Sequence, residues 1–173
     1  MHTYKRYGFT LIELIIVMLI SATLALLLMG GFISSLTRGK DSKRKGDLNQ
    51  LRQAVEMYYE DKRSYPPQNK ADNSSFTTGA SNTYINKKYS FIVSNKTYIN
   101  RLPEDPNSAF EYVYITDGTY YRFFSCIENK NDTSEGVSQG GFTGGPSDCG
   151  SGCPVCKYTI YSPNITPLPT IAL

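Results

Sequence analysis

A long uncharged apolar segment near the N-terminus constrains this chain more than any other feature. Residues 14–37 contain no Asp, Glu, Lys, Arg or His. As an α-helix this segment is about 36 Å long, which exceeds the roughly 30 Å hydrocarbon core of a bilayer. A helix buried in a soluble protein carries regularly spaced polar residues, whereas residues 14–29 contain only Ser21 and Thr23. The segment is therefore predicted to be a membrane-inserted helix.

A short basic leader precedes this segment, and one carboxylate lies at its edge. Lys5 and Arg6 come before Gly8, and Glu13 follows Gly8 by five positions. A charged side chain in the middle of a membrane helix costs about 2.5–3.5 kcal/mol on insertion scales, so Glu13 is expected to have a partner. An ordinary secretory signal is not favoured, because the apolar run is long and no A-x-A site follows it.

The segment KRYGFTLIE, residues 5–13, resembles the class III leader of type IV pilins and type II secretion pseudopilins. In that family a prepilin peptidase cuts after the glycine and methylates the new N-terminus. The resemblance implies cleavage between Gly8 and Phe9. It also implies that Glu13 pairs with the N-terminal amine of a neighbouring subunit and sets the register of assembly. A plain signal anchor with a stray glutamate is the alternative.

Beyond residue 37 the pattern predicts an amphipathic continuation of the helix. Leu48, Leu51 and Val55 recur three and four positions apart, which places them on one helical face. No proline occurs before Pro66, so one helix is predicted from residue 9 to residue 62, about 80 Å long. The run GDLNQLRQAVEMYYEDKRSYPP, residues 46–67, also resembles the end of the corresponding helix in major pseudopilins.

Residues 64–173 are predicted to form a globular head. Two β-rich runs, residues 110–116 and 119–127, are joined by Asp117 and Gly118, a pattern that favours a type I′ hairpin. The other expected segments are strands at residues 89–93 and 157–161, a polar loop at 68–83, a glycine-rich loop at 136–152, and an extended or disordered proline-bearing tail.

The predicted fold class is α+β: a long N-terminal transmembrane-then-amphipathic helix packed on a small antiparallel sheet, which is the pilin fold implied by the resemblance. The predicted divisions are a class III leader peptide at 1–8, a transmembrane or filament-core helix at 9–37, its amphipathic continuation at 38–63, and the head at 64–173. The head is expected to hold the glycine-rich, cysteine-bearing loop and the extended tail.

Four cysteines, Cys126, Cys149, Cys153 and Cys156, all lie in the predicted head. In an exported protein an even set predicts two disulfides, one of which ties the later cysteines to Cys126; the sequence does not say which one. Two other chemistries stay open. A zinc site made of all four thiolates needs a reducing compartment. A redox C-x-x-C needs a helix N-terminus after the motif, whereas the residues that follow are strand-like.

The charges that flank the apolar segment favour the opposite topology. Two basic residues precede the segment, and five lie within residues 38–45, so the positive-inside rule would keep the head in the cytoplasm. The leader resemblance and the four cysteines favour an exported head. Residues 38–45 are themselves predicted to be a solvated collar that faces phospholipid.

Catalysis and metal binding have little support in the composition. The only histidine, His2, lies in the predicted leader, so the processed chain would lack Ser-His-Asp or Cys-His catalysis and His-ligated zinc. Glu104, Asp105 and Asp117 lie near turns but lack the spacing of calcium ligands. No catalytic residue and no cofactor is predicted, with calcium and zinc left open. The formal net charge of +3 does not favour a nucleic acid partner.

These features predict a non-enzymatic structural subunit of a type IV pilus-like filament or a type II secretion pseudopilus. The partners implied are copies of itself or related pilins, the prepilin peptidase, membrane lipid before assembly, and an inner-membrane assembly platform. The chain is expected to cross the cytoplasmic membrane once with its head outside, and then to enter an extracellular filament or a periplasmic pseudopilus. The alternatives are a minor, tip or DNA-uptake pilin, and a signal-anchored membrane protein whose cytoplasmic head binds zinc through its four cysteines.

Overall fold

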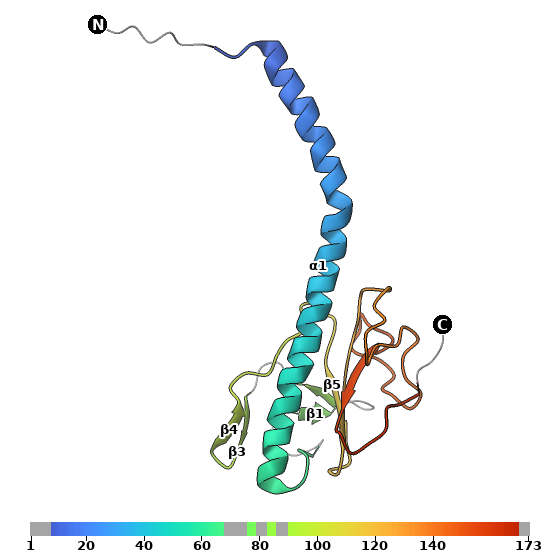
Figure 1. Cartoon of the computed structure of the whole chain (residues 1–173). Coiled ribbons are helices and arrows are strands. Elements are labelled where there is room, and N and C mark those ends of the chain that lie inside the picture. The colour runs from blue at the N-terminus through green and yellow to red at the C-terminus, as the bar shows by residue number, and fades with distance from the viewer. Residues whose placement is uncertain (1–7, 68–75, 79–82, 86–89, 170–173) are drawn as a thin grey trace, which may run out of the picture. The chain divides into compact units, whose positions relative to one another are not determined.

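The computed structural model describes residues 8–67, 76–78, 83–85 and 90–169. The chain divides into two compact units, Met1–Thr37 and Arg38–Leu173. Figure 1 shows the long helix α1 and the strands of the head. The described elements are α1 (Leu11–Lys62), β1 (Phe76–Thr78), β2 (Thr83–Ile85), β3 (Phe91–Val93), β4 (Lys96–Ile99), β5 (Val113–Thr116), β6 (Tyr121–Ser125) and β7 (Tyr158–Tyr161).

The first unit contains the apolar part of α1. The helix begins at Leu11, two residues later than predicted, because Thr10 acts as its N-cap. The large apolar side chains described between Leu11 and Leu27 are 48–80% exposed. A window of this helix has a mean hydropathy of 2.7 and meets the length and composition expected of a membrane span. The predicted apolar segment is therefore one continuous helix whose apolar surface this unit does not bury.

The second unit is a two-sheet head packed on residues 38–62 of α1. The larger sheet has five antiparallel strands in the order β1-β2-β5-β6-β7, and β3 pairs with β4 in a separate hairpin. The predicted apolar face of the helix is confirmed, since Leu48, Leu51 and Val55 are at most 1% exposed. Burying each such side chain stabilises the fold by about 1.5–3 kcal/mol.

The central strands of the larger sheet are buried on both faces. Side chains alternate between the two faces of a strand. Tyr114 and Phe123 lie opposite each other and join the core cluster that includes the helix. Val113 and Phe124, the neighbouring pair in the register, join a second cluster that includes all four cysteines. The sheet therefore has the helix on one side and the cysteine-bearing loops on the other.

The prediction of a type I′ turn at Asp117 and Gly118 is wrong. Thr116 pairs with Tyr121, so the β5–β6 connection is residues 117–120. The Asp117 carboxylate accepts hydrogen bonds from the backbone N–H groups of two residues in this turn, at 2.8 and 3.1 Å. An aspartate that caps its own turn favours this longer connection. Gly118 still takes the left-handed conformation, with φ of 91°.

The remaining strand predictions have mixed outcomes. The strand at 157–161 is confirmed as β7, and the strand at 89–93 is shorter, since β3 begins at Phe91 and residue 89 lies outside the described residues. Strands β1, β2 and β4, which are three or four residues long, were not predicted. Strand β1 lies within the predicted polar loop, most of which is outside the described residues. The tail at 162–169 is irregular, and Thr143 donates its backbone N–H to the Pro169 carbonyl.

Candidate functional site

The first turn of α1 holds Glu13 in a reciprocal hydrogen-bonded cap. The Glu13 N–H donates to Thr10 Oγ1 at 3.3 Å, and the Thr10 N–H donates to Glu13 Oε2 at 3.2 Å. This is a capping box, which satisfies two backbone donors that the start of a helix leaves unpaired. The carboxylate also lies at the positive end of the helix dipole. Glu13 therefore has a role within the subunit, which its T-x-x-E spacing would have predicted.

Gly8 and Phe9 lie just before this cap, outside helix and strand. The Phe9 side chain is 82% exposed, and a Cβ added at Gly8 would meet no atom within 4 Å. A peptide bond at this position is accessible, as a peptidase substrate must be. Cleavage there stays a prediction.

Arg44 is fully buried, which corrects the expectation of a solvated collar at this residue, whereas Arg38, Lys40 and Lys43 are exposed as predicted. Its Nε and Nη2 atoms donate to the two Asp105 carboxylate oxygens at 2.8 and 2.9 Å, a bidentate pair. Nη1 donates to Asp41 at 2.6 Å and Nη2 to Glu128 at 2.8 Å. Burial lowers the pKa of Arg44, but the hydrogen bonds to Asp105, Glu128 and Asp41 outweigh it and raise this pKa above its ordinary value.

The Arg44 cluster, which consists of Arg44, Asp41, Asp105 and Glu128, fastens two loops of the head to the helix. Besides binding Arg44, the Asp41 carboxylate accepts the backbone N–H groups of Glu128 and Asn129, at 3.0 and 2.8 Å. Asp105 likewise accepts the N–H of Asn107 at 2.8 Å. Each carboxylate thus bonds both a cation and backbone donors, so the charges are satisfied although they are buried.

The carboxylates weighed as calcium ligands are occupied by other contacts. Asp105 binds Arg44, Asp117 caps its own turn, and the Glu104 carboxylate lies 3.6 Å from Arg101 Nη2. Among the residues that the structure describes, no group of three or more His, Cys, Asp or Glu side chains is arranged to hold a metal ion. The acidic side chains of the Arg44 cluster already surround a cation, which is the guanidinium itself.

A row of tyrosines connects the head to carboxylates of the helix, and we call it the tyrosine seam. In each pair a tyrosine hydroxyl donates to an α1 carboxylate, so a polar group that packing against the helix would leave unsatisfied has a partner. The pairs are Tyr112 with Asp47 at 2.7 Å, Tyr121 with Glu56 at 2.9 Å, Tyr65 with Glu56 at 3.2 Å, and Tyr98 with Asp61 at 2.7 Å.

The tyrosine seam shifts the titration of its members. Burial and the hydrogen bond to Asp61 raise the pKa of Tyr98 to about 12. Burial, together with Asp47 or Glu56, raises the pKa of Tyr112, Tyr121 and Tyr65 as well. A phenolate beside a carboxylate would repel it, so these hydroxyls keep their protons in the folded head.

The four cysteines form two buried disulfides, Cys126–Cys153 and Cys149–Cys156. Bonded sulfurs cannot act as four thiolate ligands, so the four-cysteine zinc site does not fit this structure. The C-x-x-C cysteines bond to other partners instead of each other, and strand β7 follows them. This arrangement is a structural staple of the second core cluster.

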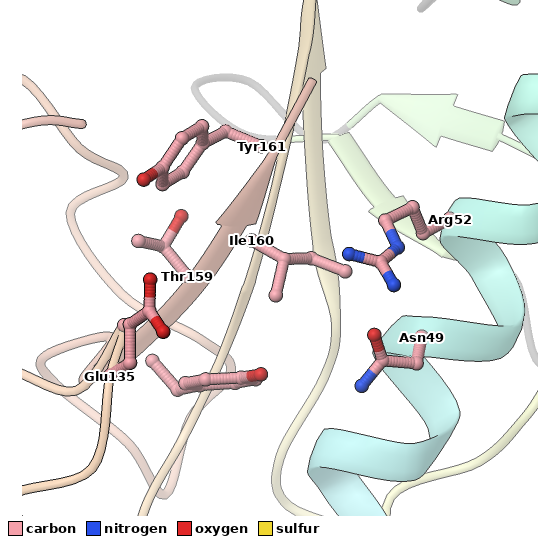
Figure 2. Close-up of a pocket in the computed structure, with 8 residues that line it drawn as sticks. Asn49, Arg52, Glu135, Thr159, Ile160 and Tyr161 are labelled. Atoms are coloured by element: carbon pink, nitrogen blue, oxygen red, sulfur yellow. The ribbon is translucent and has the colours of Figure 1, made fainter. Parts of the chain in front are cut away.

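A small surface pocket of about 300 Å³ lies between the helix and the sheet edge within the head. Figure 2 shows Asn49 and Arg52 on α1 at one side, with Glu135 and strand β7 across from them. Arg52 is exposed. The pocket thus presents a guanidinium and a carboxylate to solvent, a chemistry suited to polar surface contacts.

Both the N-terminal apolar segment and much of the head match known protein families. Residues 3–29 match the prokaryotic N-terminal methylation motif, and residues 32–140 match the family described as type II secretion system (T2SS), protein G. The chain belongs to the type II secretion system protein G family. The predicted resemblance to pilins and pseudopilins is confirmed, and members of this family are structural pseudopilin subunits.

A relative from another organism supports the family match. The type II secretion system core protein G of Escherichia coli K12 is 29% identical over 118 residues, which cover 68% of this chain and 77% of the relative. No solved structure matches the chain.

The sequence contained a signal for the buried Arg44 that the prediction did not use. Counting back from Leu51 and Leu48 by helical steps of three and four reaches Arg44 and then Asp41. Both residues therefore lie on the predicted apolar face. A charged pair on a buried face calls for further carboxylates from the head, but their identity required the fold.

Proposed function

We propose that this chain is a filament subunit that is made as a membrane-inserted precursor and cut between Gly8 and Phe9. It then assembles with copies of itself or related pilins into a pseudopilus or type IV pilus-like fibre. The observation that carries the proposal is the uncovered apolar half of α1, in a chain whose head is a separate compact unit. Lipid covers this surface first, and the same surface of neighbouring subunits covers it in the fibre.

The proposed assembly repeats one contact along the fibre. Each subunit offers one surface to the subunit ahead and a different surface to the one behind. Such a heterologous contact generates a helical filament when its rotation does not close into a ring. The family match favours the pseudopilus over the pilus, because it extends into the head.

Glu13 is proposed to set the register of this contact. In the single subunit its carboxylate is shared with the Thr10 N–H and hydroxyl. Cleavage before Phe9 creates an amine, and the amine of a neighbour provides the opposite charge. Each charge alone is costly in lipid, so their pairing favours the one stacking position that brings them together.

The proposed location follows from the disulfides and the leader. Two disulfides are stable where the environment is oxidising, which supports a head that lies outside the cytoplasmic membrane. The leader remains inside, where a prepilin peptidase reaches it. An inner-membrane assembly platform then extracts the processed subunit. This function is non-enzymatic.

The test of processing is the intact mass of the chain, without reduction, from membrane, sheared-surface and periplasmic fractions. The expected species begins at N-methylated Phe9 and lacks the hydrogens of two disulfides. Presence in the sheared or periplasmic fibre fraction shows assembly. A chain that retains residues 1–8 and has four free thiols would overturn both the cut site and the exported head.

The test of register is the substitution Glu13→Gln. Glutamine keeps the capping-box hydrogen bonds but removes the charge, so helix and membrane insertion are retained while filament yield falls to background. Glu60→Gln is the matched control, because the Glu60 side chain is 72% exposed and lies in the head part of α1. Normal filament yield from Glu13→Gln would sink the register role.

A further inference from the structure

The two disulfides of the head cross each other in the sequence. Cys126 bonds Cys153 and Cys149 bonds Cys156, so the first cysteine bonds the third and the second bonds the fourth. Four cysteines allow three pairings, and this is the only one of them in which the two bonded segments interleave. We call Cys126–Cys153 and Cys149–Cys156 the crossed pairs.

Oxidation in chain order favours a different pairing. In a head exported from its N-terminal side, Cys126 and Cys149 emerge before the other two and can pair first. Cys153 and Cys156 remain, in a C-x-x-C that closes the smallest possible ring in this set. Loop entropy hardly distinguishes Cys149 from Cys153 as the partner of Cys126, because the loops that the two bonds would close differ by only four residues.

The crossed pairs are selected by contacts that exist only in the folded head. The Glu111 N–H donates to the Cys149 carbonyl, and the Gly152 N–H donates to the Ala109 carbonyl, at 2.9 and 3.1 Å. The fit is close, since a Cβ at Gly150 would lie 2.6 Å from the Ala109 oxygen. The loop that carries Cys149 and Cys153 is thus placed by the segment before β5.

Burial then closes the sulfurs to exchange. The four cysteines are at most 5% exposed. Thiol–disulfide exchange needs a thiolate to reach a disulfide sulfur. A wrong pairing must therefore be corrected while the head is still open, before the second core cluster forms.

We propose that maturation of this chain requires a thiol–disulfide isomerase, a reduced dithiol protein that acts on the exported head before it closes. The proposal rests on the proposed function, because it needs the head in an oxidising compartment. The first bonds form when a disulfide oxidant takes up the electrons of the four thiols, which release their protons.

The isomerase step is neutral in electrons. Its thiolate attacks Cys149 in the Cys126–Cys149 bond, and Cys126 leaves as a thiolate. Cys126 attacks Cys153 in the Cys153–Cys156 bond and expels Cys156. Cys156 then attacks Cys149 in the mixed disulfide, which completes the crossed pairs and returns the isomerase thiolate.

The test expresses the full chain in a host with an oxidising periplasm, with and without its periplasmic thiol–disulfide isomerase. Non-reducing peptide mapping by mass spectrometry of the membrane fraction then identifies the bonds. With the isomerase, the crossed pairs are expected as the main species. Without it, Cys126–Cys149 and Cys153–Cys156 are expected to replace them.

Two-cysteine variants provide the matched control. C126S/C153S retains only Cys149 and Cys156, and C149S/C156S retains only Cys126 and Cys153. Neither variant can form a consecutive competitor, so each is expected to form its single bond equally in both hosts. A bond that forms poorly without the isomerase even here would mean that the enzyme acts on something other than pairing, which overturns the proposal.

The remaining outcomes distinguish a failure of the isomerase proposal from a failure of the proposed function. Crossed pairs at equal abundance in both hosts overturn the isomerase requirement and leave the proposed function intact. Four free thiols in both hosts show that the head is not exported, which overturns the proposed function and this inference with it.

Discussion

The two halves of α1 differ in what covers them. From Leu11 to Thr37 the helix is apolar, and its described large side chains are about half exposed or more. From Arg38 to Lys62 it is rich in charge, yet it contains the most completely buried side chains of the helix. Apolar content therefore does not say which part of a helix the chain itself buries. The head of the same subunit covers the charged half, whereas the apolar half needs lipid or other subunits to cover it.

The difference follows from the partners that each half has. The head supplies Asp105 and Glu128 to a helical arginine, and it supplies tyrosine hydroxyls to helical carboxylates. These contacts are directional, so they fix where the head sits along residues 38–62. An apolar surface has no such direction, which suits a segment that exchanges lipid for neighbouring helices.

The largest effect is expected when the Arg44 cluster loses its cation. Arg44→Gln leaves Asp41 and Asp105 buried without their charge partner, and breaking a buried pair in this way costs about 3–5 kcal/mol of unfolding free energy. Arg63→Gln is the control, because its ion pair with Glu60 is exposed and is worth about 0–1 kcal/mol. Urea unfolding of the detergent-solubilised chain, followed by tyrosine circular dichroism, measures both. Equal effects would mean that the cluster does not hold the head.

The same truncation in the two halves tests their independence directly. Leu51→Ala removes a side chain that is 1% exposed, so it should lower the unfolding free energy of the head by about 2–5 kcal/mol. Leu19→Ala removes one that is 63% exposed in the apolar half and should leave that free energy unchanged. A loss at Leu19 comparable to the loss at Leu51 would show that the two halves unfold together.

The tyrosine seam is expected to make the head sensitive to alkali. The pKa of Tyr98 is about 12 in the folded head and 10.0 ordinarily. A raised pKa contributes stability that is fully present below pH 10 and is lost as pH rises through about 12.

Tyr98→Phe removes this contribution, so the unfolding free energy of the variant should fall less than that of the parent between pH 10 and 12. Tyr120→Phe, which lies outside the seam, is the control and should follow the parent. Parallel pH profiles for Tyr98→Phe and the parent would exclude Tyr98 as a source of the alkaline sensitivity. Urea unfolding at each pH provides the comparison.

The parts of the fold that were predictable from sequence are those in which apolar residues follow a local pattern. The apolar run, the face of Leu48, Leu51 and Val55, and the strand β7 each repeat a local pattern, and the structure has them where expected. The N-terminal T-x-x-E is equally local. It was passed over because Glu13 was interpreted only through its expected partner in assembly.

The parts that were not predictable depend on contacts between distant segments. Asp105 and Glu128 reach Arg44 from loops that lie 61 and 84 residues away in sequence. The crossed pairs likewise depend on a loop fitted against Ala109 and Phe110. The assembled fold determines these partners, because the entropy of loop closure differs little between partners that are distant in sequence.

The smallest expected effect compares one glycine in each half. Gly46 lies in the head part of α1, and a Cβ there would meet no atom within 4 Å. Gly46→Ala should therefore raise the unfolding free energy of the head by about 1 kcal/mol, because alanine restricts the unfolded chain and favours the helix. Gly31 also has open space around it, but it lies in the apolar half. Gly31→Ala should leave head stability unchanged in the urea measurement. A gain at Gly31 equal to that at Gly46 would mean that unfolding of the head also melts the apolar half, so that the two halves form one cooperative unit.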